Sequence, residues 1–299
     1  MTNLSRLQTE QRNPRSMHID RMATLDMVRV INQEDHLVAQ AVEKELSHIA
    51  EAVDVITSKL KTGGRLIYCG AGTSGRLGVL DASECPPTYG VDPGMVVGLI
   101  AGGPTAVTQA AEGAEDKAEL GVEDLKSISF TEKDVLVGIA ASGRTPYAIG
   151  AMDYAHSVGA PVIAVVCCAD SEMSRHADIT IAPVPGPEVV TGSSRMKSGT
   201  AQKMVLNMLS TASMIKLGKV YENLMVDLRP SNEKLVQRAV RIVSSATGSE
   251  ETEARRALEE ADMHCKTAIV MILMNLSAED ARSALSKSDG RIAQAVEKG

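Results

Sequence analysis

One stretch decides the fold: Arg65-Leu66-Ile67-Tyr68-Cys69-Gly70-Ala71-Gly72-Thr73-Ser74-Gly75-Arg76. Its apolar part is typical of a buried strand, and a loop of glycine and hydroxyl residues follows before a helical pattern begins. This order places backbone N–H groups and small hydroxyls at a helix N-terminus, where an anion such as phosphate binds well. The carboxylate of Glu84 follows a few residues later, which indicates chemistry in addition to phosphate binding.

The rest of the sheet is predicted by four further apolar runs: Met95–Ile100, Val135–Ala140, Val162–Val166 and Ile179–Ala182. Helical patterns lie around 105–120, 146–158 and 195–217, and another covers 34–61 ahead of the first strand. Strands that alternate with helices predict an α/β fold with a doubly wound, mostly parallel five-stranded sheet. In such sheets a ligand binds beyond the carboxyl ends of the strands, near the point where the strand order reverses.

Three domains are expected along the chain. Residues 1–55 form an N-terminal arm and helix, 56–222 the α/β domain, and 223–299 a small C-terminal domain of three helices, similar to a UBA domain. The three helices are expected over Asn232–Val243, Glu250–Asn275 and Ala278–Glu297. Residues 1–25 are polar and lack the apolar segment of a secretory signal, so they are interpreted as an arm that packs on another part of the protein.

Composition excludes several function classes. The 299 residues carry a net charge of −7 with no basic run, which argues against a nucleic-acid partner. No apolar stretch approaches the roughly 20 residues that a membrane-spanning helix requires. Five cysteines without CxxC spacing predict neither a disulfide framework nor a zinc site, and most of them are interpreted as core residues in a reducing cytoplasm. The six histidines form no cluster that would indicate a metal site or a catalytic triad.

Hydroxyl-rich loops follow two of the predicted strands. Ser142-Gly143-Arg144-Thr145 could cradle a phosphate, or could be an ordinary turn in which Thr145 caps the next helix. Thr73 and Ser74 repeat the same chemistry at a neighbouring strand end, which favours the phosphate site. Thr191–Thr200 could complete that site through Ser193, Ser194 and Lys197, or hold a substrate carboxylate. The alternative is a capped helix start with solvated charges.

Carboxylates near these loops are candidate acids and bases. Glu84 precedes Pro86-Pro87, which is expected to end any helix there. Glu112 and Glu115 lie three residues apart, so on a helix they share a face. Such residues are most often solvated surface charges, and their spacing alone does not establish catalysis.

Taken together, the loops at 70–76 and 142–145 resemble the sugar-isomerase (SIS) domain, a phosphosugar-binding α/β module. Longer blocks are similar to those of the N-acetylmuramic acid 6-phosphate etherase family. These blocks are Leu80–Gly90, Glu112–Asp116, Val190–Lys197, Asn232–Leu235 and Cys265–Ala268. The likeness covers essentially the whole chain, and no motif position departs from the family pattern.

The resemblance implies a cytoplasmic bacterial lyase of cell-wall recycling. Such an enzyme cleaves the D-lactyl ether of N-acetylmuramate 6-phosphate and gives N-acetylglucosamine 6-phosphate and D-lactate. The resemblance also implies that no metal or organic cofactor is needed and that the protein is a homodimer with its site near the subunit boundary. On the family motif Glu84 is the proton donor and Glu115 a second active-site glutamate.

The chemistry suits two carboxyl groups. In the open-chain sugar the C1 aldehyde acidifies the C2 proton, so a carboxylate base can remove it while an acid protonates the departing ether oxygen. We infer that Glu115 is the C2 base. The substrate phosphate is then expected at Thr73, Ser74, Ser142, Gly143, Arg144, Thr145, Ser193, Ser194 and Lys197. Arg195 or Lys197 is a candidate for the lactyl carboxylate.

Two other function classes share these loops. A phosphosugar isomerase would return the proton to C1 and release no lactate, and the blocks around Glu84 and Glu115 disfavour it. A non-enzymatic phosphosugar sensor could regulate transcription or a kinase. Residues 1–60 are too short for a helix-turn-helix domain with its linker, which disfavours the transcription regulator. Release of D-lactate separates all of these alternatives.

Overall fold

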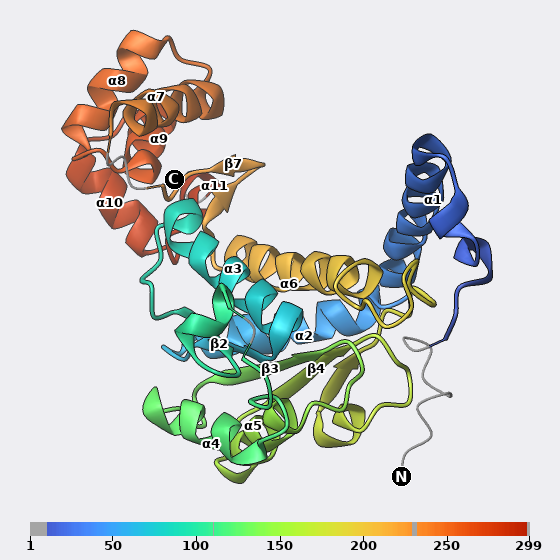
Figure 1. The fold of residues 1–299 in the computed structure, drawn as a ribbon. Coiled ribbons are helices and arrows are strands. Elements are labelled where there is room, and N and C mark those ends of the chain that lie inside the picture. Colours follow the sequence, from blue (N-terminus) through green and yellow to red (C-terminus); the bar gives the residue numbers. More distant parts are fainter. Residues whose placement is uncertain (1–10, 110, 229–231, 298–299) are drawn as a thin grey trace. The chain divides into compact units, whose positions relative to one another are not determined.

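The computed structural model describes residues 11–109, 111–228 and 232–297 (Figure 1). Within this part of the chain, Met1–Ser83 and Gly94–Ser210 contribute to one compact unit, and Glu84–Pro93 and Thr211–Gly299 to a second. The first unit contains the parallel sheet and the second is mostly helical. The predicted domain boundaries at 55/56 and 222/223 stay a prediction.

The sheet of the first unit has the order β2-β1-β3-β4-β5, and every neighbouring pair is parallel. Its strands are β1 (Leu66–Gly70), β2 (Val96–Ile100), β3 (Val135–Ala140), β4 (Val162–Val166) and β5 (Ile179–Ile181). The predicted five-stranded parallel sheet is therefore confirmed. The chain places β2 on one side of β1 and β3 on the other, so the strand order reverses between β1 and β3.

Helices cover both faces of the sheet (Figure 1). On one face α4 (Ala118–Ser127) and α5 (Pro146–Ser157) form a core with Ile67 and Cys69 of β1. On the other face lie α2 (Leu46–Lys61) and the beginnings of α3 (Gly72–Tyr89) and α6 (Lys197–Lys216). Tyr68 of β1 points to this second face, because its hydroxyl donates to Asp81 of α3 at 2.8 Å. Alternate residues of β1 therefore anchor the two helical layers.

The N-terminal segment packs against other parts of the first unit. It contains η3 (Pro14–Ser16), η4 (Ile19–Arg21) and α1 (Thr24–Glu43). The Asn13 side chain donates to the Pro187 carbonyl at 3.1 Å, and the Ser16 hydroxyl donates to the Val189 carbonyl at 2.7 Å. The expectation of a packed arm is confirmed from residue 11 on, while residues 1–10 lie outside the described part.

Two expectations about helices in the first unit are wrong. The single helix over 34–61 is two helices, because the chain leaves helical geometry at Glu45, whose carboxylate accepts the Ala182 N–H at 3.1 Å. The helix over 105–120 is only η5 (Pro104–Val107) followed by a loop up to α4. The positive φ of Gly113, 74°, contributes to keeping this segment out of a helix. Glu112 and Glu115 therefore lie on a loop and not on one helix face.

The expected helix end at Pro86-Pro87 is also wrong, because α3 continues through both prolines to Tyr89. Each proline removes one intrahelical bond to a carbonyl one turn earlier, and α3 ends two residues after Pro87. The N–H of Gly90 bonds to the Pro86 carbonyl at 3.0 Å and closes the helix.

The second unit contains more helices than the three predicted. After the hairpin β6 (Val220–Tyr221) and β7 (Leu224–Met225), its described helices are α7 (Glu233–Thr247), α8 (Glu251–Glu260), α9 (Cys265–Met274), α10 (Ala278–Ser286) and α11 (Ile292–Glu297). The helix expected over 250–275 is interrupted at Asp262 and Met263, which have φ of 54° and 62°. The helix expected over 278–297 is interrupted near Asp289, which also has a positive φ. Left-handed backbone cannot continue a right-handed helix.

All five cysteines are buried free thiols, as the sequence predicts. Within the described ranges, no helix combines the length and the apolar character needed to cross a bilayer.

Candidate functional site

A cavity of about 290 Å³ lies at the carboxyl ends of β1 and β3, where the strand order reverses. Its lining comes from the two strand-to-helix loops, from the loop before α4 and from the segment before α6. The lining residues are Ala71, Gly72, Thr73, Ser74, Glu115, Ala140, Ala141, Ser142, Thr145 and Ser194. We call this space the hydroxyl pocket. Its position is the one that a parallel sheet of this order favours for a ligand.

Hydroxyl groups are the main polar groups of the hydroxyl pocket. Four of them, on Thr73, Ser142, Thr145 and Ser194, make no hydrogen bond with another described residue. Thr145 occupies the N-cap of α5, yet its side chain does not cap the helix, so the hydroxyl remains available to a ligand. The fifth hydroxyl, on Ser74, donates to Gln202 at 2.9 Å and is held in place by that bond.

Two helices begin at the hydroxyl pocket. The first turn of α3 carries N–H groups without intrahelical partners, and the partial positive charge of its N-terminus favours an anion there. The start of α5 offers fewer, because Pro146 has no N–H and the Tyr147 N–H bonds to the Glu115 carbonyl. The third nearby helix, α6, is different. Its first N–H groups, those of Lys197 and Ser198, bond at 2.9 Å to the buried carboxylate of Glu188. An anion is therefore best received at the start of α3, beside the hydroxyls of Ser142 and Thr145.

The turn after β3 is fixed by its surroundings. Gly143 has φ of 64°, and a Cβ added to it would lie 2.3 Å from the Cβ of Ser171. Its carbonyl also accepts the Met173 N–H at 2.9 Å. The positive φ and the lack of room for a Cβ both require a glycine at this position. The fixed turn holds the neighbouring Ser142 and Thr145 at the pocket wall.

Glu115 is the carboxylate that reaches the hydroxyl pocket. It is exposed, and its carbonyl accepts the Tyr147 N–H at the start of α5 at 3.0 Å. It also lines a second cavity of about 180 Å³, which we call the side cavity. The other residues of the side cavity are Ala71, Gly72, Arg76, Ala101, Ala106, Ala111 and Glu112. Glu115 therefore lies where the two spaces meet.

Several predicted site residues lie elsewhere. Gly143, Arg144 and Ser193 are next to pocket residues in the chain but do not line the pocket themselves. Glu84 is exposed on α3 and lines neither of the two cavities. Three residues before it, Asp81 is buried and accepts hydrogen bonds from Tyr68, Asn207 and Ser210. Burial raises the pKa of Asp81 above its ordinary value.

Lys197 takes part in a buried ion pair. Its side chain is fully buried, and its Nζ lies 2.6 Å from Glu34 of α1 and 2.9 Å from the Pro185 carbonyl. Arg15 of the N-terminal arm bonds to the other oxygen of Glu34. Burial favours a higher pKa for Glu34, but the hydrogen bonds from Arg15 and Lys197 outweigh it and the pKa is lowered. The cluster joins the arm, α1 and the start of α6.

Three residues in and around the two cavities were not predicted from the sequence: Arg76, Gln202 and Glu188. Arg76 follows Gly72 by four residues, so the helical pattern after the glycine loop could have placed both on one face of α3. Gln202 and Glu188 carry no local signal, because their partners Ser74 and Ser198 become neighbours only through the fold.

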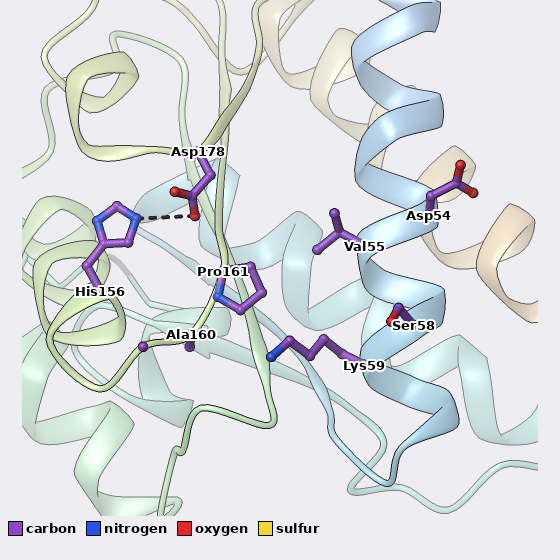
Figure 2. A pocket seen from close by; sticks show the side chains of 9 residues that line it. Asp54, Val55, Ser58, Lys59, His156, Ala160, Pro161 and Asp178 are labelled. Atoms are coloured by element: carbon purple, nitrogen blue, oxygen red, sulfur yellow. Dashed lines mark hydrogen bonds and ion pairs between the residues drawn. The ribbon is translucent and has the colours of Figure 1, made fainter.

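A larger cavity, of about 650 Å³, lies at the opposite ends of the strands (Figure 2). Pro161 and Asp178 directly precede β4 and β5, and Val55 and Lys59 come from α2. Figure 2 shows His156 directed at Asp178, with 3.3 Å between Nε2 and Oδ2. This open groove has no hydroxyl cluster, and it lies at the amino ends of the strands, where ligands of parallel sheets do not usually bind.

The second unit contains an ionic cluster of its own. Lys266 and Lys219 lie 2.6 and 3.1 Å from Oδ2 of Asp227, and His264 lies 3.9 Å from Oδ1. Burial lowers the pKa values of Lys266 and His264.

Comparison with known families assigns both parts of the chain. Residues 48–156 match the N-terminal SIS domain of glucokinase regulatory protein, and residues 121–212 match the SIS domain. Residues 222–266 match the C-terminal lid domain of glucokinase regulatory protein.

Solved structures agree on the fold. A putative phosphosugar isomerase involved in capsule formation from Bacteroides fragilis matches 67% of this chain and 95% of its own, with a TM-score of 0.52 and 19% identity. A phosphoheptose isomerase from Francisella tularensis matches 65% of this chain and 100% of its own, with a TM-score of 0.51 and 18% identity. Likeness at this level of identity shows the SIS fold alone.

Full-length relatives are much more similar. The N-acetylmuramic acid 6-phosphate etherase of Aeromonas hydrophila is 61% identical over 97% of this chain and 98% of its own. The proteins of the same name from Photobacterium profundum and Clostridium botulinum are 60% and 58% identical, and each match covers 99% of this chain and at least 98% of the relative. Identity of this extent, together with a carboxylate at a hydroxyl-lined pocket of an SIS fold, shows that the chain belongs to the N-acetylmuramic acid 6-phosphate etherase family.

Proposed function

We propose that this protein is a carbon–oxygen lyase that releases D-lactate from N-acetylmuramate 6-phosphate and leaves N-acetylglucosamine 6-phosphate. The observation that carries the proposal is the position of Glu115, a carboxylate beside a pocket of hydroxyls and helix N-termini. The relatives named above support the choice of substrate. We further propose that the reaction belongs to the cytoplasmic recycling of cell-wall amino sugars, a proposal that the named relatives support.

The phosphate of the substrate binds in the hydroxyl pocket. Thr73, Ser142, Thr145 and Ser194 donate from their hydroxyls, and the first turn of α3 donates from the backbone. Gln202 accepts the hydroxyl proton of Ser74, so Ser74 contributes through its backbone N–H in the first turn of α3. Binding energy from this remote group orients C2 and C3 without taking part in the chemistry.

The reaction is an elimination followed by hydration. Glu115 takes the proton from C2 of the open-chain sugar, where the C1 aldehyde stabilises the negative charge that develops. The C2–C3 double bond forms as the C3–O bond breaks, and the ether oxygen leaves with a proton from a general acid as the hydroxyl of D-lactate. Water then adds across the double bond, with OH at C3 and H at C2.

The general acid is Glu84, and it is supplied by a second copy of the chain. Glu84 lines neither the hydroxyl pocket nor the side cavity of its own chain. Because Glu84 is solvent-exposed here, a second copy could present it to the site. We therefore propose a homodimer with its sites at the subunit boundary.

The experiment is an enzymatic assay of D-lactate during incubation with N-acetylmuramate 6-phosphate. We expect stoichiometric D-lactate and N-acetylglucosamine 6-phosphate. If the folded protein instead interconverts aldose and ketose phosphates, it is an isomerase and the proposal is wrong. If it binds the sugar phosphate and converts nothing, it is a sensor and the proposal is equally wrong.

A further inference from the structure

The side cavity differs in chemistry from the hydroxyl pocket that it adjoins. The two share Ala71, Gly72 and Glu115. No hydroxyl side chain is among the described residues that line the side cavity. Besides Glu115 it offers one guanidinium, one further carboxylate and several alanine methyl groups. A substrate that spans both spaces therefore meets two kinds of recognition on either side of Glu115.

Arg76 supplies the cation of the side cavity. It lies one turn after Gly72 on α3 and is partly buried. Its Nε donates to the Val107 carbonyl at 2.9 Å, which fixes the plane of the guanidinium. Its two terminal nitrogens make no hydrogen bond or ion pair with another described residue. A guanidinium fixed through Nε and open at both Nη atoms is suited to bidentate binding of a carboxylate.

The walls beside Arg76 are small and apolar. They are formed by the methyl groups of Ala101, Ala106 and Ala111, and the volume of about 180 Å³ matches a group of a few heavy atoms. A water molecule in the liquid occupies about 30 Å³, so the cavity has room for roughly six water-sized groups. The cavity therefore fits a short group that carries both a methyl and a carboxylate.

Of the groups on the proposed substrate, only the lactyl ether has both features. The phosphate is matched by the hydroxyl pocket, and the acetamido group has a methyl but no charge. We propose that Arg76 binds the lactyl carboxylate in the side cavity and is thus the residue that selects 3-O-lactyl sugars. This inference rests on the proposed function.

The geometry that follows is consistent with the elimination. A phosphate in the hydroxyl pocket and a lactyl group in the side cavity place the carbons between them beside Glu115, which lines both spaces. Glu112 also lines the side cavity, and its charge opposes a second carboxylate there. Neutralisation by Arg76 is therefore a condition for binding the lactyl group in this place.

The test compares two substrates and three variants. The substrates are N-acetylmuramate 6-phosphate and its lactyl amide, which has the same shape without the negative charge. The variants are Arg76→Gln, Arg76→Lys and the control Arg175→Gln, which alters an exposed arginine paired with Glu172. Kinetics of lactate or lactamide release give kcat/KM, and competition gives the affinity for N-acetylglucosamine 6-phosphate, which has no lactyl group.

We expect the wild type to prefer the acid. Arg76→Gln should lose about 10- to 100-fold in kcat/KM for the acid, because a charge-assisted hydrogen bond is lost, and little for the amide. Arg76→Lys should recover part of the loss, and the control should match the wild type. The affinity for N-acetylglucosamine 6-phosphate should stay within about twofold in every variant, since its phosphate site is untouched.

Two results would overturn the role of Arg76 while leaving the proposed function intact. One is a wild type that releases lactate but treats the acid and the amide alike. The other is an equal loss of kcat/KM for both substrates, or a parallel loss of product affinity, in Arg76→Gln. Absence of lactate release by the wild type would contradict the proposed function itself.

Discussion

The backbone N–H of Tyr147 donates to the carbonyl of Glu115 at 3.0 Å. Tyr147 lies two residues after Thr145 at the beginning of α5, so this bond joins the loop of the carboxylate to the turn that carries a pocket hydroxyl. The backbone of the proposed base is thereby fixed relative to the proposed phosphate site. Such fixed spacing is what allows the binding of one end of a substrate to orient the other.

Glu115→Gln should remove the base and keep the shape of the site. We expect kcat for D-lactate release to fall at least about a hundredfold, with little change in the affinity for N-acetylglucosamine 6-phosphate. Steady-state kinetics and a binding titration measure the two quantities, and Glu119→Gln, an exposed glutamate of α4, is the control. A variant that loses affinity and rate in parallel would make Glu115 a binding group and not the base.

Mixing two inactive variants tests the origin of Glu84. If Glu84 of one copy serves the site of the other, a mixed dimer of Glu84→Ala and Glu115→Ala has one intact site and one doubly altered site. After unfolding and refolding together, random pairing should restore about a quarter of the wild-type activity per chain, because half of the dimers are mixed. Each variant refolded alone is the control. No recovery, with mixed dimers demonstrated by differential tags, would place both glutamates of a site in one chain.

The strands and the pocket loops were predictable because their signals are local. A buried parallel strand is a short apolar run, and Gly70–Ser74 and Ser142–Thr145 follow such runs directly. The order of the strands then brings these loops together without any side-chain detail. Helix limits were less predictable. Pro86 and Pro87 lie in a last turn that tolerates them, and Glu112 lies in a loop although its neighbours have helical spacing.

Contacts between distant parts of the chain had no signal in the sequence. Lys197 lies in a hydroxyl-rich segment that resembles a binding loop, yet its partner Glu34 is 163 residues away on α1. The same holds for Ser74 and Gln202, which are separated by 128 residues. Burial and pairing of this kind decide whether a charged or polar residue faces a ligand, and they are set only when the helices pack.

Gly143→Ala should distort the turn that carries Ser142 and Thr145. The added Cβ would lie 2.3 Å from the Cβ of Ser171, and the φ of 64° is strained for any L side chain. Gly159→Ala is a matched control, because its φ is 80° but the nearest atom to its Cβ is 3.9 Å away. We expect the control to lose about 1 kcal/mol of unfolding free energy from backbone strain alone. Gly143→Ala should lose more and should also weaken phosphosugar binding, as measured by denaturant unfolding and by titration. Equal effects on stability and unaltered binding would contradict the role of this turn.

Glu34 should make the stability of the first unit dependent on acid pH. Its pKa lies below the ordinary value of 4.5, because the hydrogen bonds from Arg15 and Lys197 to its charged form outweigh the cost of burial. A carboxyl group with a lowered pKa in the folded state contributes stability that is complete above about pH 5. That contribution is lost as the pH falls through the lowered value.

Glu34→Gln should therefore destabilise the protein at pH 7 and lose this effect in acid. At pH 7 the change leaves the fully buried Lys197 without its carboxylate, for which a cost of about 3 kcal/mol is expected. Below the lowered pKa the wild-type Glu34 is itself protonated, so the free energies of unfolding of the two proteins should converge.

Urea unfolding at several pH values between 3 and 7 measures the free energy of unfolding of both proteins. Glu43→Gln, an exposed glutamate at the end of α1, should show no such dependence. A difference between wild type and Glu34→Gln that stays constant across this range would mean that shape and not charge makes Glu34 important.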